Sequence, residues 1–290
     1  MKFVWQKITI LFLLLISVQL LIVSPIFAED RLISDFEYQY EKYRQLYPEY
    51  ETARDEFLQT NSLASQNIAI EKTRTLLAQR AQVMRTYLLA LKFKLQSNLG
   101  ISKDDKEKLS ASIDDEVGWL QNHMDDINNA SNPTLGDLFE ISKRFEKKET
   151  DFRVLGYETM SRVIIGKVYT LNQEYIAISS QLKPYVEETG VGYLSNWLNE
   201  AQNSAFEALQ SLKSAETMVD ELVRKSSSSE QVIKAFTQIK TDSESAKLAL
   251  TKGIGFQNEI IDDLNKRLPA LNSVNRENIE KEATASSSNN

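Results

Sequence analysis

The chain has no cysteine, and His123 is the only histidine among its 290 residues. Without cysteine, disulfides, zinc-thiolate sites, cysteine nucleophiles and a lipidated N-terminal cysteine are excluded. With one histidine the chain cannot form a metal site from histidine pairs, an HExxH helix, or a di-iron bundle that needs two Glu-x-x-His motifs. His123 is interpreted as a helix-flank residue and not as a general base. We therefore expect a protein that is not an enzyme, with no catalytic residues, cofactor or metal ligands.

Residues that form turns are also scarce, with nine glycines and five prolines. A sheet-based fold of this length would need many more of them. The glycine-rich phosphate loop and the serine nucleophile elbow are absent as well. At 42% hydrophobic and 26% charged residues, the composition is typical of a folded chain. These features predict an all-α protein made of few, long helices.

The N-terminus has the charged, apolar and cleavage regions of a secretory signal. Lys2 and Lys7 precede a long apolar run, and the small residue Ala28 precedes two acidic residues. The sequence thus predicts a signal peptide over 1–28, with cleavage after Ala28. The alternative is an uncleaved anchor, since residues 8–28 nearly reach the ~20 residues that span a bilayer. Both interpretations export the remainder, so we expect an extracytoplasmic protein that is periplasmic, at the cell surface or secreted.

The net charge limits the partners. The formal charge is −7, and removal of the signal leaves 32 basic against 41 acidic residues, a charge of about −9. Such an acidic chain is poorly suited to nucleic acid or to an anionic lipid surface. We expect no nucleic-acid partner, and membrane contact only through residues 8–28 if these are not cleaved.

An aromatic seam lies between residues 36 and 57. Six rings follow one another at spacings of 4, 3, 4, 3 and 7, so they share one side of a helix and are predicted to be buried in the core. Arg54 is the one charge in the series and is predicted to set the register by pairing across helices. Ser34 and Glu37 form a capping box that predicts a helix start at about Asp35. The rings are Phe36, Tyr40, Tyr43, Tyr47, Tyr50 and Phe57.

Further heptad stripes follow, separated by breaks near residues 60, 100, 130, 190 and 227. They predict an elongated up-and-down bundle of about six long helices with coiled-coil-like heptad packing, as one domain over 29–268. Within 134–183 two stripes lose phase around Gly156, which predicts either one continuous helix or a bend there. Residues 269–290 are polar and are predicted to be a disordered tail.

Three aromatic residues lie off the main seams. Tyr38 is the best candidate for an exposed contact, whereas Trp119 and Trp197 either widen the core or mark an interface. Together they are the candidate interaction surface. The acidic residues recurring every 11 positions, Asp104, Asp115 and Asp126, are interpreted as a solvated helix face and not as a cation site.

These patterns match no family at the level of motifs. The leading hypothesis is an exported, non-catalytic interaction or structural protein of the cell envelope or extracellular space. It would present helical faces to a protein partner or to another copy of itself. The alternative is a small-ligand-binding, sensor-like ectodomain tethered by its N-terminal helix.

Overall fold

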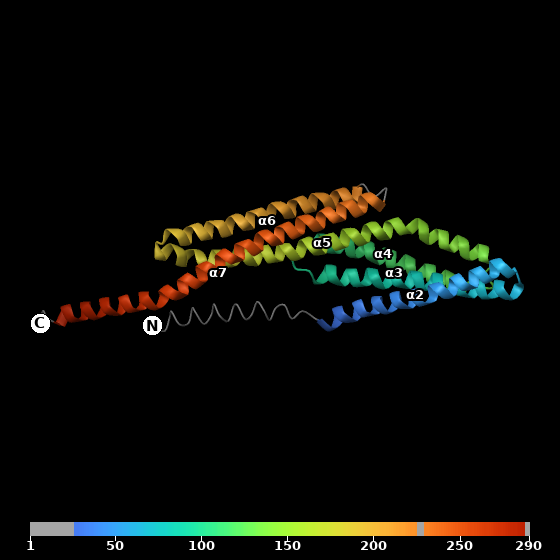
Figure 1. Ribbon diagram of the computed structural model, residues 1–290, viewed down its shortest axis with the longest axis horizontal. Helices are drawn as coiled ribbons and strands as arrows, with labels where there is room; N and C mark the ends of the chain where they lie inside the picture. The colour runs from blue at the N-terminus through green and yellow to red at the C-terminus, as the bar shows by residue number, and fades with distance from the viewer. Residues whose placement is uncertain (1–25, 225–228, 288–290) are drawn as a thin grey trace. The chain divides into compact units, whose positions relative to one another are not determined.

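The computed structural model describes residues 26–224 and 229–287, with side chains described for 31–224 and 230–267. These residues form six α-helices and no strand, which confirms the predicted all-α fold and its bundle packing (Figure 1). Within the same ranges no helix is both long and apolar enough to cross a bilayer. The helices are α2 (Ile26–Thr60), α3 (Leu63–Ser97), α4 (Lys103–Asn129), α5 (Leu135–Thr189), α6 (Gly192–Arg224) and α7 (Ser229–Ser287).

The chain divides into two compact units, where the sequence predicted one domain over 29–268. Unit 1 comprises Met1–Ser97 and Lys106–Gly156, and unit 2 comprises Asn98–Asp105 and Tyr157–Asn290. The boundary at Gly156 falls where the two heptad stripes of α5 lose phase. Nevertheless α5 is one continuous helix of 55 residues, about 82 Å at 1.5 Å per residue. The change of phase at Gly156 therefore separates the part of α5 that belongs to unit 1 from the part that belongs to unit 2.

Local signals place most of the helix ends. The turn between α2 and α3 contains Asn61 with φ of 48°, a conformation that asparagine tolerates. Ser102 caps the start of α4, because its hydroxyl accepts from the Asp105 amide at 3.1 Å and donates to the Asp105 carboxylate at 2.7 Å. Both Pro48 and Pro184 lie inside helices that continue past them.

Two predicted helix ends are wrong. The Ser34 capping box does not start α2, which begins at Ile26, since no glycine or proline interrupts the backbone bonds between them. At the other end, α7 continues through Pro269 to Ser287, although 269–290 was predicted to be disordered. Residues 269–287 contain three glutamates, three alanines, one lysine and one arginine, which favour helix. The predicted signal peptide lies largely outside the described residues, and its cleavage stays a prediction.

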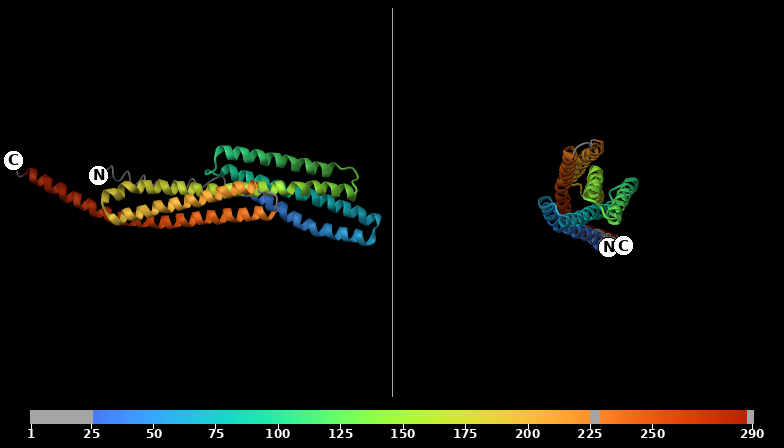
Figure 2. Two further views of the ribbon diagram at one scale, coloured as in Figure 1. Left: turned by 90° about the horizontal axis from the view of Figure 1, so that it is seen from above. Right: turned by 90° about the vertical axis from the view of Figure 1, so that its right-hand side faces the viewer.

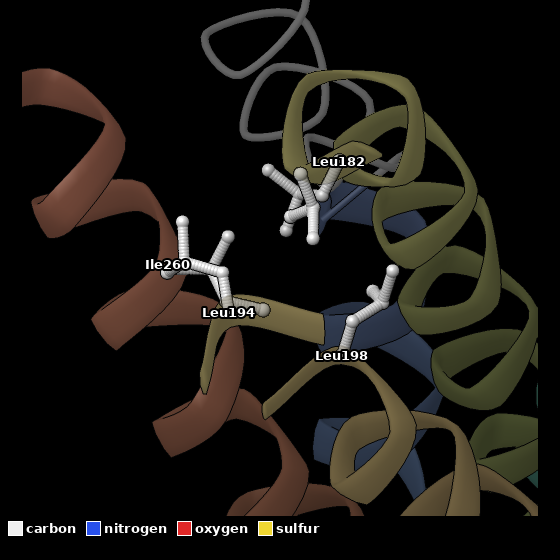
Figure 3. Close-up of a cluster of buried hydrophobic side chains, with 5 residues drawn as sticks. Leu182, Leu194, Leu198 and Ile260 are labelled. Carbon is white, nitrogen blue, oxygen red and sulfur yellow. The ribbon is translucent and has the colours of Figure 1, made fainter. Parts of the chain in front are cut away.

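Unit 2 is built from the second part of α5, α6 and α7, and α6 and α7 run side by side in both views of Figure 2. The predicted heptad stripe of α6 is buried along its whole length, from Leu194 to Leu222. Figure 3 shows where this core ends: Leu182 of α5, Leu194 and Leu198 of α6 and Ile260 of α7 point toward one another. The frequent alanines of α6 let its neighbours approach closely.

Two buried polar side chains inside unit 2, Tyr175 and Gln257, form hydrogen bonds between its helices. The buried Tyr175 hydroxyl donates to the Ala201 carbonyl at 2.8 Å, and burial raises its pKa to about 12. Gln257 donates to the Tyr175 carbonyl at 3.0 Å and to the Ser179 hydroxyl at 2.7 Å. Gly253 leaves room for the ring, because a Cβ there would lie 2.7 Å from Cζ of Tyr175. This close approach explains a glycine inside a helix.

Unit 1 contains α2, α3, α4 and the first part of α5. Leu88 and Leu95 near the end of α3 are fully buried. One core cluster joins Leu77 of α3, Ile127 of α4 and Leu138 of α5. Arg74 on α3 caps the C-terminal end of α4, since its Nε donates to the Ile127 carbonyl at 2.9 Å.

Candidate functional site: an aromatic groove in unit 1

The aromatic seam of α2 is not the buried core that the sequence predicted. Tyr40 and Tyr47 are 49% and 41% exposed, and the other four rings are half-buried. Among residues 31–60, the buried hydrophobic side chain is Ala53, on the side of α2 that faces α3. Heptad spacing placed the rings on one side of the helix correctly, but unit 1 supplies α2 with too few neighbours to cover them.

The seam instead forms one wall of an open groove with a volume of about 360 Å³. Side chains of α2, α3 and α5 line it, so three helices of one unit contribute to it. Phe139 on α5 is 57% exposed at its edge. We call this feature the aromatic groove. Its lining residues are Tyr43, Tyr47, Tyr50, Arg54 and Phe57 of α2, Ala69, Thr73, Leu76, Leu77 and Arg80 of α3, and Leu135, Leu138, Phe139 and Ser142 of α5.

Arg54 and Arg80 both line the aromatic groove, and Arg80 is the more buried of the two. Its Nη2 donates to the Ser142 hydroxyl at 3.2 Å, and its guanidinium lies 4.1 Å from the ring centroid of Phe145. Its Nε is buried and has no hydrogen-bond partner among the described residues. Burial lowers the Arg80 pKa, while Tyr43, Glu146 and Glu149 oppose that effect. The groove therefore combines aromatic walls with a positive charge, on which the carboxylates of Glu146 and Glu149 act electrostatically.

An aromatic cluster around His123 forms part of the core of the same unit. The imidazole stacks on Trp119 with centroids 4.8 Å apart and planes at 15°, and it lies 5.7 Å from the Phe145 ring. His123 is 3% exposed, so the prediction that it lies on a helix flank is wrong. Burial is the main cause that lowers its pKa to about 4, with Arg144 adding to the effect. It is thus a neutral core residue at pH 7.

The three predicted contact residues have different environments. Tyr38 is 66% exposed on α2, as predicted. Trp119 is half-buried and widens the core, since its ring lies 5.7 Å from that of Phe152. Trp197 belongs to unit 2, where it packs against the core cluster at the end of α6 and meets the Tyr193 ring edge-on at 5.0 Å. Of the three, Tyr38 offers a free surface.

Arg54 does not pair across helices, so that prediction is wrong. Its guanidinium binds the adjacent Asp55 at 2.9 Å on the surface and lies 5.7 Å from the Tyr50 ring centroid. The α2–α3 pair is joined by an ion pair between Lys72 and Glu49 at 2.9 Å instead.

The acidic side of α4 forms ion pairs with neighbouring helices. Asp126 pairs with Arg144 at 3.0 Å and Glu116 pairs with Lys148 at 2.7 Å, both on α5. Asp115 is exposed, as expected for a solvated face. Across residues 26–224 and 229–287, no group of three or more histidine, aspartate or glutamate side chains is placed to hold a metal ion.

Sequence reasoning missed Arg80 and Phe139. Arg80 had a visible signal, because it follows Leu77 by three residues and precedes Met84 by four on the apolar side of its helix. Phe139 had no such signal in the sequence, since its partners in the groove include residues of α2, some 80 residues earlier. Neither a family model, a curated protein nor a solved structure matches the chain.

Proposed function

We propose that this is an exported, non-catalytic interaction protein of the cell envelope or extracellular space, and that it binds a protein partner or another copy of itself through the aromatic groove. One observation carries the proposal: α2 has the ring spacing of a helix–helix seam, and the chain leaves that seam half-exposed. Large, rigid aromatic rings beside an arginine have the composition of interface hot spots.

The shape of the groove favours an α-helix as the contacting element. Three helices contribute side chains to the groove, and the docking of an amphipathic helix into an apolar groove is a recurring mode of recognition. A helical partner would cover Tyr47 and Phe139 at the edges without moving the backbone. The signal-like N-terminus supports export. The burial of His123 in an aromatic core supports a role without catalysis.

Site-specific cross-linking tests this function. Benzoylphenylalanine placed at Tyr47 should capture a protein neighbour in cells that produce the chain, and the same probe at Phe206 serves as the control. Phe206 is a 62% exposed ring on α6 in unit 2. A Tyr43→Ala/Tyr47→Ala variant should lose the contact while its helical content stays unchanged. Equal cross-linking from both positions, or none from Tyr47, would overturn the proposal.

The second candidate function is binding of a small organic anion. The cavity volume of about 360 Å³ lies in the usual range for ligand pockets, and Arg80 offers a positive charge beside aromatic walls. A thermal-shift screen with aromatic carboxylates distinguishes this function. A stabilisation that Arg80→Gln abolishes would favour it over a protein partner, and no stabilisation by any compound would remove it.

A further inference from the structure

The outer side of α2 carries a second 4-3 series beside the groove, and we call these residues the outer seam. The series is Tyr40, Arg44, Tyr47, Glu51 and Arg54, which spans about 21 Å of helix. Tyr40, Arg44, Tyr47 and Arg54 are exposed, and Tyr47 and Arg54 also line the aromatic groove. The outer seam is therefore the part of the groove that another molecule would meet first.

We propose that the occupant is a second copy of this chain, with the two α2 helices antiparallel and related by a two-fold axis at Tyr47. This inference rests on the proposed function and names its partner. With Tyr47 opposite Tyr47, helix register places Tyr40 opposite Arg54 of the second copy, and Arg44 within one residue of the position opposite Glu51. The symmetry repeats each pairing, as an isologous interface requires.

Charge complementarity selects this arrangement over the alternatives. In the antiparallel pair each charge of the outer seam meets an opposite charge or the face of an aromatic ring. A parallel pair would place Arg44 on Arg44, Glu51 on Glu51 and Arg54 on Arg54, all of which repel.

The side chains are available for these contacts. Arg44 now pairs with Glu41 at 3.2 Å and Arg54 with Asp55 at 2.9 Å, and all four groups are largely solvent-exposed. Exposed ion pairs of this kind contribute little and exchange readily. The helix of the second copy would lie along the mouth of the aromatic groove and cover part of Tyr47, which a single copy leaves 41% exposed.

Charge reversal tests the pairing. Sedimentation velocity of the purified protein should show a dimer, whose dissociation constant rises about tenfold or more in Arg44→Glu or in Glu51→Arg, because each change affects two symmetric pairs. The double variant Arg44→Glu/Glu51→Arg should restore the wild-type value. Lys42→Glu is the matched control, since this exposed residue lies on the opposite side of the same helix.

The absence of native cysteine gives a second measurement. A Tyr47→Cys variant should form a disulfide-linked dimer on mild oxidation, whereas Lys42→Cys should not. A wild-type chain that sediments as a monomer at 100 µM, or a dimer insensitive to both charge reversals, would overturn the proposal. If the chain is monomeric but a different protein cross-links at Tyr47, the result supports the proposed function and contradicts the two-fold pairing. If neither a dimer nor a cross-link at Tyr47 forms, both the proposed function and the two-fold pairing are contradicted.

Discussion

Acid should destabilise unit 1 through His123. The imidazole is 3% exposed and stacked on Trp119, so its protonated form loses water and gains no hydrogen-bond acceptor at the buried Nε2. Burial lowers the pKa to about 4, Arg144 and Arg80 add to this, and Asp126 opposes it. In the unfolded chain the same group titrates near 6.5.

The sign and size of the effect follow from linkage. Below pH 6.5 the imidazole is protonated in the unfolded chain but stays neutral in the folded unit. The free energy of unfolding therefore falls as the pH falls from 6.5 towards 4. The difference in pKa corresponds to a loss of about 2 kcal/mol at pH 5 and about 3 kcal/mol below pH 4. A loss of this size is a large fraction of the stability of a typical domain.

A His123→Phe variant isolates this contribution. Phenylalanine retains the stacked ring but removes both the titration and the unpartnered Nε2. Urea unfolding monitored by circular dichroism at pH 7 and pH 5 should therefore show a smaller loss of stability in the variant, by about 2 kcal/mol. Carboxylates that titrate in both proteins cancel in the comparison.

Nuclear magnetic resonance measures the same quantity directly. His123 is the only histidine, so one set of imidazole signals reports its titration without an assignment problem. We expect a midpoint well below 6.5. A midpoint near 6.5, or parallel pH profiles for the wild type and His123→Phe, would refute the reasoning and would mean that the imidazole is hydrated in solution.

Three further substitutions test the packing. Gly253→Ala should destabilise unit 2 by roughly 1–3 kcal/mol in urea unfolding, because the added Cβ meets the Tyr175 ring; an unchanged midpoint would contradict this. Asn98→Ala should cost roughly 1–3 kcal/mol, since its Nδ2 donates to the Val163 carbonyl at 2.7 Å, and faster exchange of the Gly100 amide, which donates to the Asn98 Oδ1 at 3.0 Å, would accompany the loss. Arg54→Ala should change the unfolding free energy by less than about 0.5 kcal/mol, because its ion pair is exposed. A loss above about 1 kcal/mol would contradict this and would mean that Arg54 does stabilise the fold.

Much of the fold could be predicted because heptad spacing is a local property. The stripe from Leu194 to Leu222 is buried as predicted, and Ser102 caps α4 through hydroxyl and carboxylate groups only three residues apart. The limits of this approach appear at Ser34, where an equally good capping pair lies inside a helix that begins earlier. A cap can start a helix, but it does not stop one that is already hydrogen-bonded.

The sequence by itself determined which side of each helix is apolar, where most helices end, and that the phase changes at Gly156. Only the tertiary structure decided whether those sides are covered. It buries His123 in an aromatic cluster and leaves Tyr47 at the mouth of a groove, although both lie beside apolar residues in the sequence. The physical reason is that periodicity fixes the direction of a side chain about its own helix axis. Burial depends on how many other helices lie in that direction, and those come from distant parts of the chain.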